Sequence, residues 1–236
     1  MTSFLLYIIK LSCNLILFYA GYKLLLSRET FFRFNRKTLL TGMLVCMLLP
    51  LIKIKTDTPS SIQQPMVQLE KIIIEEDSAL TLIADNETVS AAIPVNKPIN
   101  RISPVYLLTL IFAIGSFVHI LILIHSHVSL YFFIRNGRKI IQGDCTIVLS
   151  DKQVTPFNYG RYIILSEKDY REHPDTILTH ELAHFRFNHS FDIIMVELIA
   201  LLQWFNPVVR LLKKEIRKIH EFQADAEVLK TGIDAT

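Results

Sequence analysis

The sequence predicts a mainly α-helical integral membrane protein, in which transmembrane helices are joined to a folded domain with a small β-sheet. Of the 236 residues, 51% are hydrophobic and 20% are charged, whereas a soluble domain usually carries about 25% charged residues. The apolar residues are concentrated in long runs, and clusters of lysine and arginine follow these runs. Both features are typical of membrane proteins whose basic loops stay in the cytoplasm. The net charge of +3 is too small to indicate a nucleic acid partner, so the expected partner is the lipid bilayer.

Residues 1–54 are predicted to hold two transmembrane helices joined by a basic cytoplasmic loop. The first runs from Phe4 to about Leu26, with no basic residue before it, which favours a retained helix over a cleaved signal. The second, from Thr38 to Ile52, would cover about 22 Å, which is short for a hydrocarbon core of about 30 Å. Lysines flank this run on both sides, so a short spanning helix is favoured over a buried soluble one.

Residues 55–104 differ in composition from the runs on either side. Prolines and an excess of acidic over basic residues predict an extracytoplasmic loop, in which KIIIEED (71–77) has the composition of a short strand. Residues 105–134 contain no Asp, Glu, Lys or Arg and are predicted to form the third transmembrane helix. His125 and His127 lie near its end, where an interfacial position is expected. Basic residues follow directly, which again indicates the cytoplasmic side.

Residues 135–236 are predicted to form one domain that faces the cytoplasm. CTIVLS (145–150) and RYIILS (161–166) are rich in β-branched residues and predict two strands. The segment between them contains Pro156 and Gly160, which favour a turn. The remainder of the domain is expected to be helical.

Within this domain, THELAHFRFNHS (179–190) contains two histidines, His180 and His184, on either side of Glu181. Pro174 is suited to the first turn of a helix. Residues four apart on a helix share one face, so both imidazoles can reach one metal ion. Zinc binds imidazole nitrogen, and Glu181 can take a proton from the attacking water. The alternative is a helix whose histidines face solvent or satisfy hydrogen bonds in the core.

A catalytic zinc site requires a third protein ligand. The class whose motif continues as H-E-x-x-H-x-x-G-x-x-H is excluded, because Phe187 and Ser190 occupy the required positions. The downstream glutamates are Glu197, Glu215, Glu221 and Glu227. Only Glu221, in HEFQADAEVL, has an acidic residue four positions later, Asp225. Glu221 is therefore the predicted third ligand of one Zn²⁺ ion, and Asp225 is predicted to accept a hydrogen bond from a zinc-bound histidine. The alternative for both carboxylates is a solvated helix face.

Residues 191–209 separate the two halves of this site and have the apolar character of a fourth membrane helix. If they crossed the bilayer, Glu221 would emerge on the opposite side from His180, and the two could not share a metal ion. Asp192 and Glu197 are costly in a lipid-facing helix, and a basic cluster of the cytoplasmic type follows. The sequence therefore predicts a re-entrant or interfacial helix that does not cross.

Four features of the domain occur together in one known family. They are HELAHFRFNHSFD, then WFNP (204–207), then a basic helix leading to HEFQAD, and the turn PFNYG before RYIILS. In these features the chain resembles the membrane-embedded zinc peptidases of the BlaR/MecR type, the bacterial β-lactam sensor-transducers and their relatives. The resemblance covers most of the chain, is strongest from about residue 145 to 230, and is far more specific than H-E-x-x-H alone.

The resemblance implies a gluzincin-like zinc endopeptidase in the bacterial inner membrane, with its active site facing the cytoplasm. It implies that His180, His184 and Glu221 bind zinc and that Glu181 acts as general base. It also implies that an outside signal triggers self-cleavage or cleavage of a cytoplasmic transcriptional repressor. Family members generally continue into a further membrane helix and a C-terminal domain, whereas this sequence ends at Thr236 and contains no S-x-x-K motif. The chain is then expected to be either a peptidase-only fragment or a reduced member, and this departure puts a β-lactam sensing role in doubt.

Two alternatives to a regulatory protease stay open from the sequence. One is a protease that removes misfolded membrane proteins, and the other is a non-catalytic membrane transducer with a structural zinc site. In either protease, the strand RYIILS is expected to offer its edge to an extended peptide substrate. His189 and His220 are further histidines, either of which could assist the substrate or the transition state, and neither is assigned to the site. The three cysteines are expected to be unpaired thiols.

Overall fold

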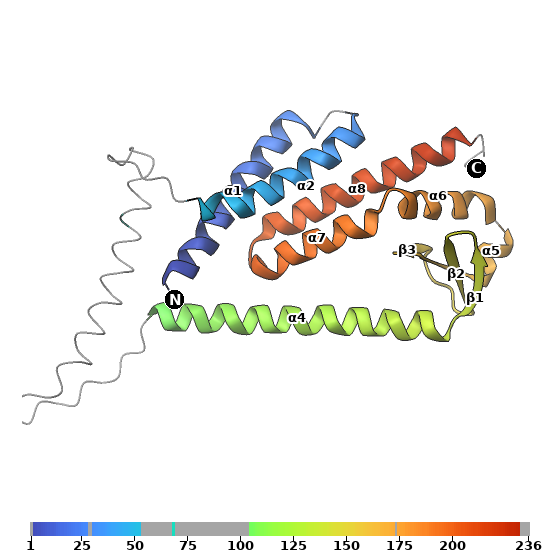
Figure 1. Cartoon of the computed structure of the whole chain (residues 1–236), viewed down its shortest axis with the longest axis horizontal. Helices are drawn as coiled ribbons and strands as arrows, with labels where there is room; N and C mark the ends of the chain where they lie inside the picture. Colours follow the sequence, from blue (N-terminus) through green and yellow to red (C-terminus); the bar gives the residue numbers. More distant parts are fainter. Residues whose placement is uncertain (1, 28–29, 53–67, 69–103, 173, 232–236) are drawn as a thin grey trace, which may run out of the picture.

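The computed structural model describes residues 2–27, 30–52, 68, 104–172 and 174–231. Most of the loop predicted at 55–104, including KIIIEED, lies outside these residues. The helices are α1 (Thr2–Leu25), α2 (Phe32–Leu48), the 3₁₀ turn η1 (Leu49–Leu51), α4 (Pro104–Asn136), α5 (Glu167–Glu172), α6 (Pro174–Arg186), α7 (His189–Leu202) and α8 (Pro207–Lys230). The strands are β1 (Arg138–Gln142), β2 (Cys145–Ser150), β3 (Phe157–Tyr159) and β4 (Tyr162–Ser166). The sheet, α5 and α6 lie at the C-terminal end of the long helix α4 (Figure 1).

Among the described residues, two helices are long and apolar enough to cross a membrane. They are Ser3–Leu25, within α1, and Pro104–Asn136, which is α4. None of the residues in the most apolar stretch of α4 is buried, as expected of a helix that faces lipid. Both helices coincide with predicted transmembrane segments. Helix α2 has 17 residues, begins with a strongly basic stretch and is not one of the two, so its crossing of the membrane stays a prediction.

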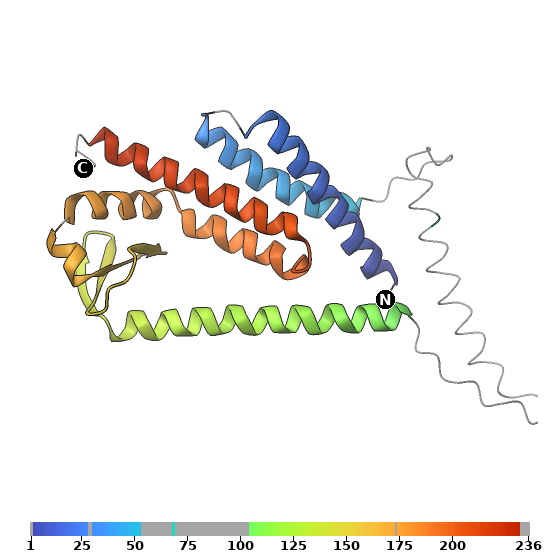
Figure 2. The same cartoon turned by 180° about the vertical axis from the view of Figure 1, so that it is seen from behind.

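Helices α7 and α8 form an antiparallel pair, and α8 brings the chain back toward α6 (Figures 1 and 2). Helix α7 has 14 residues and spans about 21 Å. Asn206 caps α8 by accepting a hydrogen bond from the backbone N–H of Val208 at 3.0 Å. His180 and Glu221 consequently lie at the same end of the bundle, as the prediction of a non-crossing segment at 191–209 requires.

The two polar side chains of the turn between α7 and α8 are buried against α1. Gln203 and Asn206 are 0% and 3% exposed. The Gln203 amide donates to the backbone carbonyl of Ile8 at 3.0 Å, and the Asn206 amide donates to the Ser12 hydroxyl at 3.0 Å. These two amides are satisfied by groups of α1, whereas the buried indole N–H of Trp204 in the same turn has no hydrogen-bond partner among the described residues.

Helix α4 contacts the same turn through aromatic rings. The rings of Phe112 and Phe205 are 6.3 Å apart. Trp204 packs so closely on Gly115 that a Cβ atom there would lie 2.1 Å from the indole ring. Counted from Pro104, these α4 residues stand about 12 and 17 Å along the helix axis. The turn therefore reaches a point well inside the length of α4, rather than either end of it.

The sheet has the strand order β1-β2-β4-β3, with β2 and β4 parallel and both outer pairs antiparallel. The strands predicted at 145–150 and 161–166 are confirmed as β2 and β4. Strands β1 and β3 were not predicted, and β3 lies within the segment that was assigned to a turn. The expectation that RYIILS offers a free edge is wrong, because β3 pairs with the outer side of β4. On that side of the sheet the edge strand is β3.

Both faces of the sheet are covered. Ile147, Ile163 and Leu165 pack against α6, whereas Val148 and Ile164 pack against the end of α4. This alternation follows from the two-residue period of a strand. Parallel strands buried on both faces read as nearly continuous apolar runs, which is the pattern of CTIVLS and RYIILS. The sheet thus fixes the position of α6 relative to α4.

Candidate metal centre

The helix that carries the histidines is positioned by its local sequence and by the sheet. Ser166 ends β4 and caps α5 by accepting a hydrogen bond from the backbone N–H of Asp169 at 3.1 Å. Pro174 then begins α6, as predicted. Ile177 and Leu178 pack toward the sheet, and another face of α6 lies against α8. The histidines point toward α8 and its carboxylates.

His180 and His184 of α6 and Glu221 of α8 each contribute one donor atom to a group within 4.8 Å. The two Nε2 atoms are 3.1 Å apart. Glu221 Oε2 lies 3.3 Å from Nε2 of His180 and 3.9 Å from Nε2 of His184. Two tetrahedral ligands at zinc-ligand distance stand about 3.3 Å apart. These two nitrogens and one carboxylate oxygen therefore fit a zinc ion.

The other ring nitrogens have partners that determine where the protons lie. His180 Nδ1 is 3.1 Å from Asp225 Oδ1, so its N–H donates to this carboxylate. His184 Nδ1 is 2.8 Å from His189 Nδ1, and His189 Nε2 is 3.0 Å from Gln223 Oε1. One assignment satisfies these contacts: His184 donates to His189, and His189 donates to Gln223. It leaves Nε2 of His180 and His184 without protons, which is the form that binds a metal.

Burial keeps two of these rings neutral. It lowers the pKa of His184 to about 4, with the charges of His180 and His220 acting in the same direction. It also lowers the pKa of His189 to about 3. Both imidazoles are therefore uncharged at neutral pH, as a metal ligand and its hydrogen-bond partner must be.

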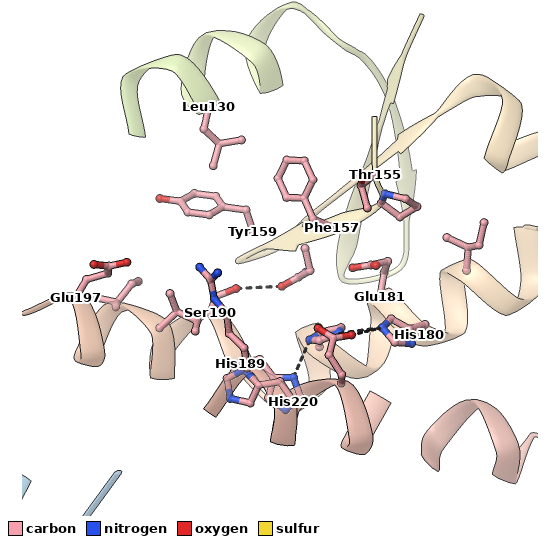
Figure 3. Close-up of a pocket in the computed structure, with 18 of the residues that line it drawn as sticks. Leu130, Thr155, Phe157, Tyr159, His180, Glu181, His189, Ser190, Glu197 and His220 are labelled. Atoms are coloured by element: carbon pink, nitrogen blue, oxygen red, sulfur yellow. Dashed lines mark hydrogen bonds and ion pairs between the residues drawn. The ribbon is translucent and has the colours of Figure 1, made fainter. Parts of the chain in front are cut away.

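Glu181 lies beside the group of ligands rather than within it. Its side chain is 5% exposed, and burial, with a contribution from the charge of Glu221, raises its pKa to about 7. Figure 3 shows Glu181 between His180 and the strand that carries Phe157 and Tyr159. A carboxyl group with a pKa near neutrality is suited to accept a proton and return it.

A cavity of about 1230 Å³ opens at these residues, between α4, β3, α6, α7 and α8. Apolar side chains of α4 and α7 line much of it: Leu123, Leu130, Ile193, Ile194, Leu198 and Leu201. Phe157 and Tyr159 of β3 line another wall. His127, expected at the interface, also lines the cavity, with its ring 6.0 Å from that of Tyr159.

Ser190 attaches the edge strand to the beginning of α7. Its hydroxyl donates to Asn158 Oδ1 at 3.0 Å and accepts from the backbone N–H of Gly160 at 3.1 Å. Gly160 has a φ of +57°, a conformation that glycine adopts without steric cost. The edge of β3 is therefore held at a fixed position relative to the histidines.

A buried network behind the histidines was not predicted. His189 and His220 are 2% and 3% exposed, and their rings stack with centroids 3.9 Å apart and 8° between the planes. His220 Nε2 donates to Asp192 Oδ2 at 2.7 Å, and Arg36 of α2 donates to the same carboxylate. The sequence contained one signal, because a carboxylate in an apolar helix requires a partner. It did not identify the partner, which lies 156 residues earlier.

The ionised form of Asp192 is maintained by this network. Burial is the largest single influence on its pKa and raises it. The hydrogen bonds and charges of His220 and Arg36 act in the opposite direction and together outweigh burial, so the pKa lies below its usual value. Asp192 is therefore a buried carboxylate paired from two sides.

The predicted site residues thus come together from two helices, with His180, His184 and Glu221 in one group and Glu181 and Asp225 next to it. No curated protein matches the chain. The family described as BlaR1 peptidase M56 matches residues 38–234. This range contains all the predicted site residues and most of the described chain, and it confirms the resemblance seen in the sequence. The chain therefore belongs to the BlaR1 peptidase family, M56.

Proposed function

We propose that the chain is a zinc-dependent endopeptidase of the bacterial inner membrane that cleaves itself or a cytoplasmic protein in response to a signal. The observation that carries this proposal is the convergence of His180, His184 and Glu221 next to the buried carboxyl of Glu181. A donor set of two imidazoles and one carboxylate is that of catalytic zinc sites, which keep a further position open for chemistry. Membership of a metallopeptidase family independently favours a metal here.

In this proposal His180, His184 and Glu221 hold the zinc ion. The ion would polarise the scissile carbonyl and acidify the attacking water. Asp225 orients the ring of His180 by accepting its Nδ1–H at 3.1 Å. Glu181 accepts the proton of the attacking water and later delivers it to the leaving amine.

The substrate is proposed to be a peptide in extended conformation that lies along β3. This strand ends the sheet on the side of the cavity, and strand addition to an edge binds peptides with little dependence on sequence. The apolar side chains of α4 and α7 in the same cavity would receive apolar residues of the substrate. A protein or peptide substrate follows from family membership, and a transcriptional repressor is our proposal for its identity.

The active site is proposed to face the cytoplasm. Basic residues follow α1 and α4, at the ends of these helices, and such clusters remain on the cytoplasmic side. The sheet, α5 and α6 lie at the same end of α4 (Figure 2). A cytoplasmic site favours a regulatory role, because a soluble repressor has access to it.

The test is to measure zinc content and proteolysis of the full chain beside Glu181→Gln. Wild type is expected to contain one equivalent of zinc and to cleave itself or a peptide substrate. Glu181→Gln is expected to retain zinc but to lose about 100- to 10,000-fold in rate, since the proton acceptor is removed.

Glu172→Gln is the matched control, because it removes an exposed carboxylate on α5 that is outside the cavity. Its cleavage rate is expected to equal that of wild type. Bound zinc without any proteolysis would favour a structural zinc site, and unchanged cleavage by Glu181→Gln would contradict the mechanism.

A further inference from the structure

A continuous set of buried contacts links helix α2 to a proposed metal ligand. Arg36 places its guanidinium against Asp192, with Nε 2.6 Å from Oδ2 and Nη2 3.1 Å from Oδ1. The same Nη2 atom donates to the backbone carbonyl of Phe187 at 2.6 Å. The side chains of Arg36 and Asp192 are 19% and 3% exposed. Arginine is suited to this position, because its rigid planar fork can hold a carboxylate through two bonds.

The contacts continue from Asp192 to the metal centre. The Asp192 carboxylate accepts from His220 Nε2 at 2.7 Å, and the His220 ring stacks on that of His189. His189 Nδ1 is 2.8 Å from Nδ1 of His184. Each of these side chains contacts the next one in the series. The final side chain, His189, contacts Nδ1 of His184, the ring nitrogen that faces away from the metal group.

Arg36 also acts on the backbone that carries these side chains. Phe187 is in the corner between α6 and α7, where Asn188 has a φ of +55°. The carbonyl of Phe187 lies just beyond the C-terminal end of α6, where backbone carbonyls lack helical partners and a cation is favourable. The corner directly precedes His189, so the guanidinium fixes both the strained backbone and the carboxylate that positions the paired rings.

We propose that Arg36 is a positioning residue of the metal centre, through which the location of α2 controls the orientation of the His184 ring. The proposal rests on the proposed zinc-binding role of His184. A histidine bound through one nitrogen is oriented by the partner of its other nitrogen. Here that partner is a buried histidine whose support comes ultimately from another helix. Displacement of α2 relative to α6 and α7 would therefore change metal binding without contact between α2 and the metal.

The experiment uses the full chain in detergent and compares Arg36→Ala and Arg36→Lys with wild type. Zinc affinity is measured by competition with a chelator, and ligand geometry by the visible absorption of the Co²⁺-substituted protein. Arg36→Ala is expected to weaken zinc binding about 10-fold or more, as is usual when a partner of a ligating histidine is disturbed, and to shift the Co²⁺ bands. Arg36→Lys keeps the charge but not the two-pronged contact, so an intermediate effect is expected.

Lys37→Ala is the matched control, because it removes the next positive charge of α2 from an exposed position. Its zinc affinity and Co²⁺ spectrum are expected to match those of wild type. A lowered Tm of Arg36→Ala with unchanged zinc affinity and Co²⁺ spectrum would show a merely structural role and overturn the proposal. If Arg36→Ala does not fold, a wild-type spectrum and affinity in Arg36→Lys would overturn it equally. A wild-type protein that binds no zinc would instead refute the proposed function itself.

Discussion

Asp192 is a single buried charged residue that connects α7 to two other helices, α2 and α8. It is paired with His220 of α8 and with Arg36 of α2. Removal of one member leaves the others as buried groups without a full set of partners, which is more costly than loss of an exposed ion pair. Lys23 and Glu215 form a useful contrast, because their ion pair between α1 and α8 is largely exposed on the lysine side.

The first consequence concerns the pH dependence of stability. The pKa of Asp192 is lower in the folded protein than its usual value of 3.8. Its contribution to stability is therefore fully present above pH 3.8 and is lost as the pH falls through the lower folded value. We expect Asp192→Asn to destabilise the protein by about 3 kcal/mol at neutral pH.

The difference in Tm between Asp192→Asn and wild type should shrink as the pH falls below 3.8, because the unfolded wild type then binds a proton that the folded carboxylate does not yet bind. Below the folded pKa both proteins carry a neutral side chain at this position. Thermal unfolding of both proteins at neutral and acidic pH measures this. His220 and Arg36 face the carboxylate, and both are retained in the variant. A Tm difference that is the same at every pH would contradict the assignment of a paired, ionised Asp192.

Those residues of the candidate site that lie close together because of their spacing along one helix could be predicted from the sequence. His180 and His184 share a face because they are four residues apart, and the same spacing marked Glu221 and Asp225. The roles of His189, His220 and Arg36 depend instead on how α2, α7 and α8 pack. That packing places residues far apart in the chain side by side, and no local pattern reports it.

Among the secondary-structure elements, α4 packs against the turn between α7 and α8 at Gly115. A Cβ atom at this position would lie 2.1 Å from the ring of Trp204. Gly115→Ala is therefore expected to destabilise the protein by about 1–3 kcal/mol, because the indole must move out of a closely packed site. Unfolding of the purified protein in detergent measures the change.

Gly21 in α1 is the matched control for this substitution. No atom would lie within 4 Å of a Cβ there, and alanine is preferred to glycine within a helix. Gly21→Ala should leave stability unchanged or raise it slightly. Equal losses in both variants would mean that helix propensity or lipid contact, rather than Trp204, determines the effect at Gly115.

Among the elements, the long and the fully buried ones were predictable. The run at 105–134 corresponds to α4, and the apolar runs at 145–150 and 161–166 correspond to β2 and β4. Strands β1 and β3 were missed because most of their residues are exposed or only partly buried, and β3 has only three residues. Their strand conformation depends on pairing with β2 and β4 rather than on composition. The same omission led to the wrong expectation that β4 has a free edge.

For the whole molecule, the decisive prediction is that residues 191–209 enter but do not cross the bilayer. Asn188 and Lys218 are both exposed and lie on opposite sides of this segment in the sequence. Asn188→Cys and Lys218→Cys, in a background in which exposed Cys13 is replaced by serine, are expected to react with a membrane-impermeant thiol reagent from the cytoplasmic side. The helix pair α7 and α8 accounts for this, because α8 returns the chain to α6.

Arg138→Cys is the reference for the cytoplasmic side, since it follows α4 directly and its side chain is 75% exposed. All three positions should be labelled from the same side. Labelling of positions 188 and 218 from opposite sides would place the two halves of the metal centre in different compartments. In that case neither the shared zinc ion nor the hydrogen bond of His220 to Asp192 could exist in the membrane.

The buried turn between α7 and α8 also bears on the order in which the protein assembles. Gln203 and Asn206 find their hydrogen-bond partners on α1, at residues that lie 195 and 194 positions earlier in the chain. Because domains tend to fold from the N-terminus during synthesis, Ile8 and Ser12 would already be present when the polar turn enters the bilayer as we propose. If residues 191–209 insert as proposed, helix α1 would serve as a template for their insertion. A chain that lacks α1 would leave the Gln203 amide without its partner, whereas Asn206 would keep its contact with Gln203.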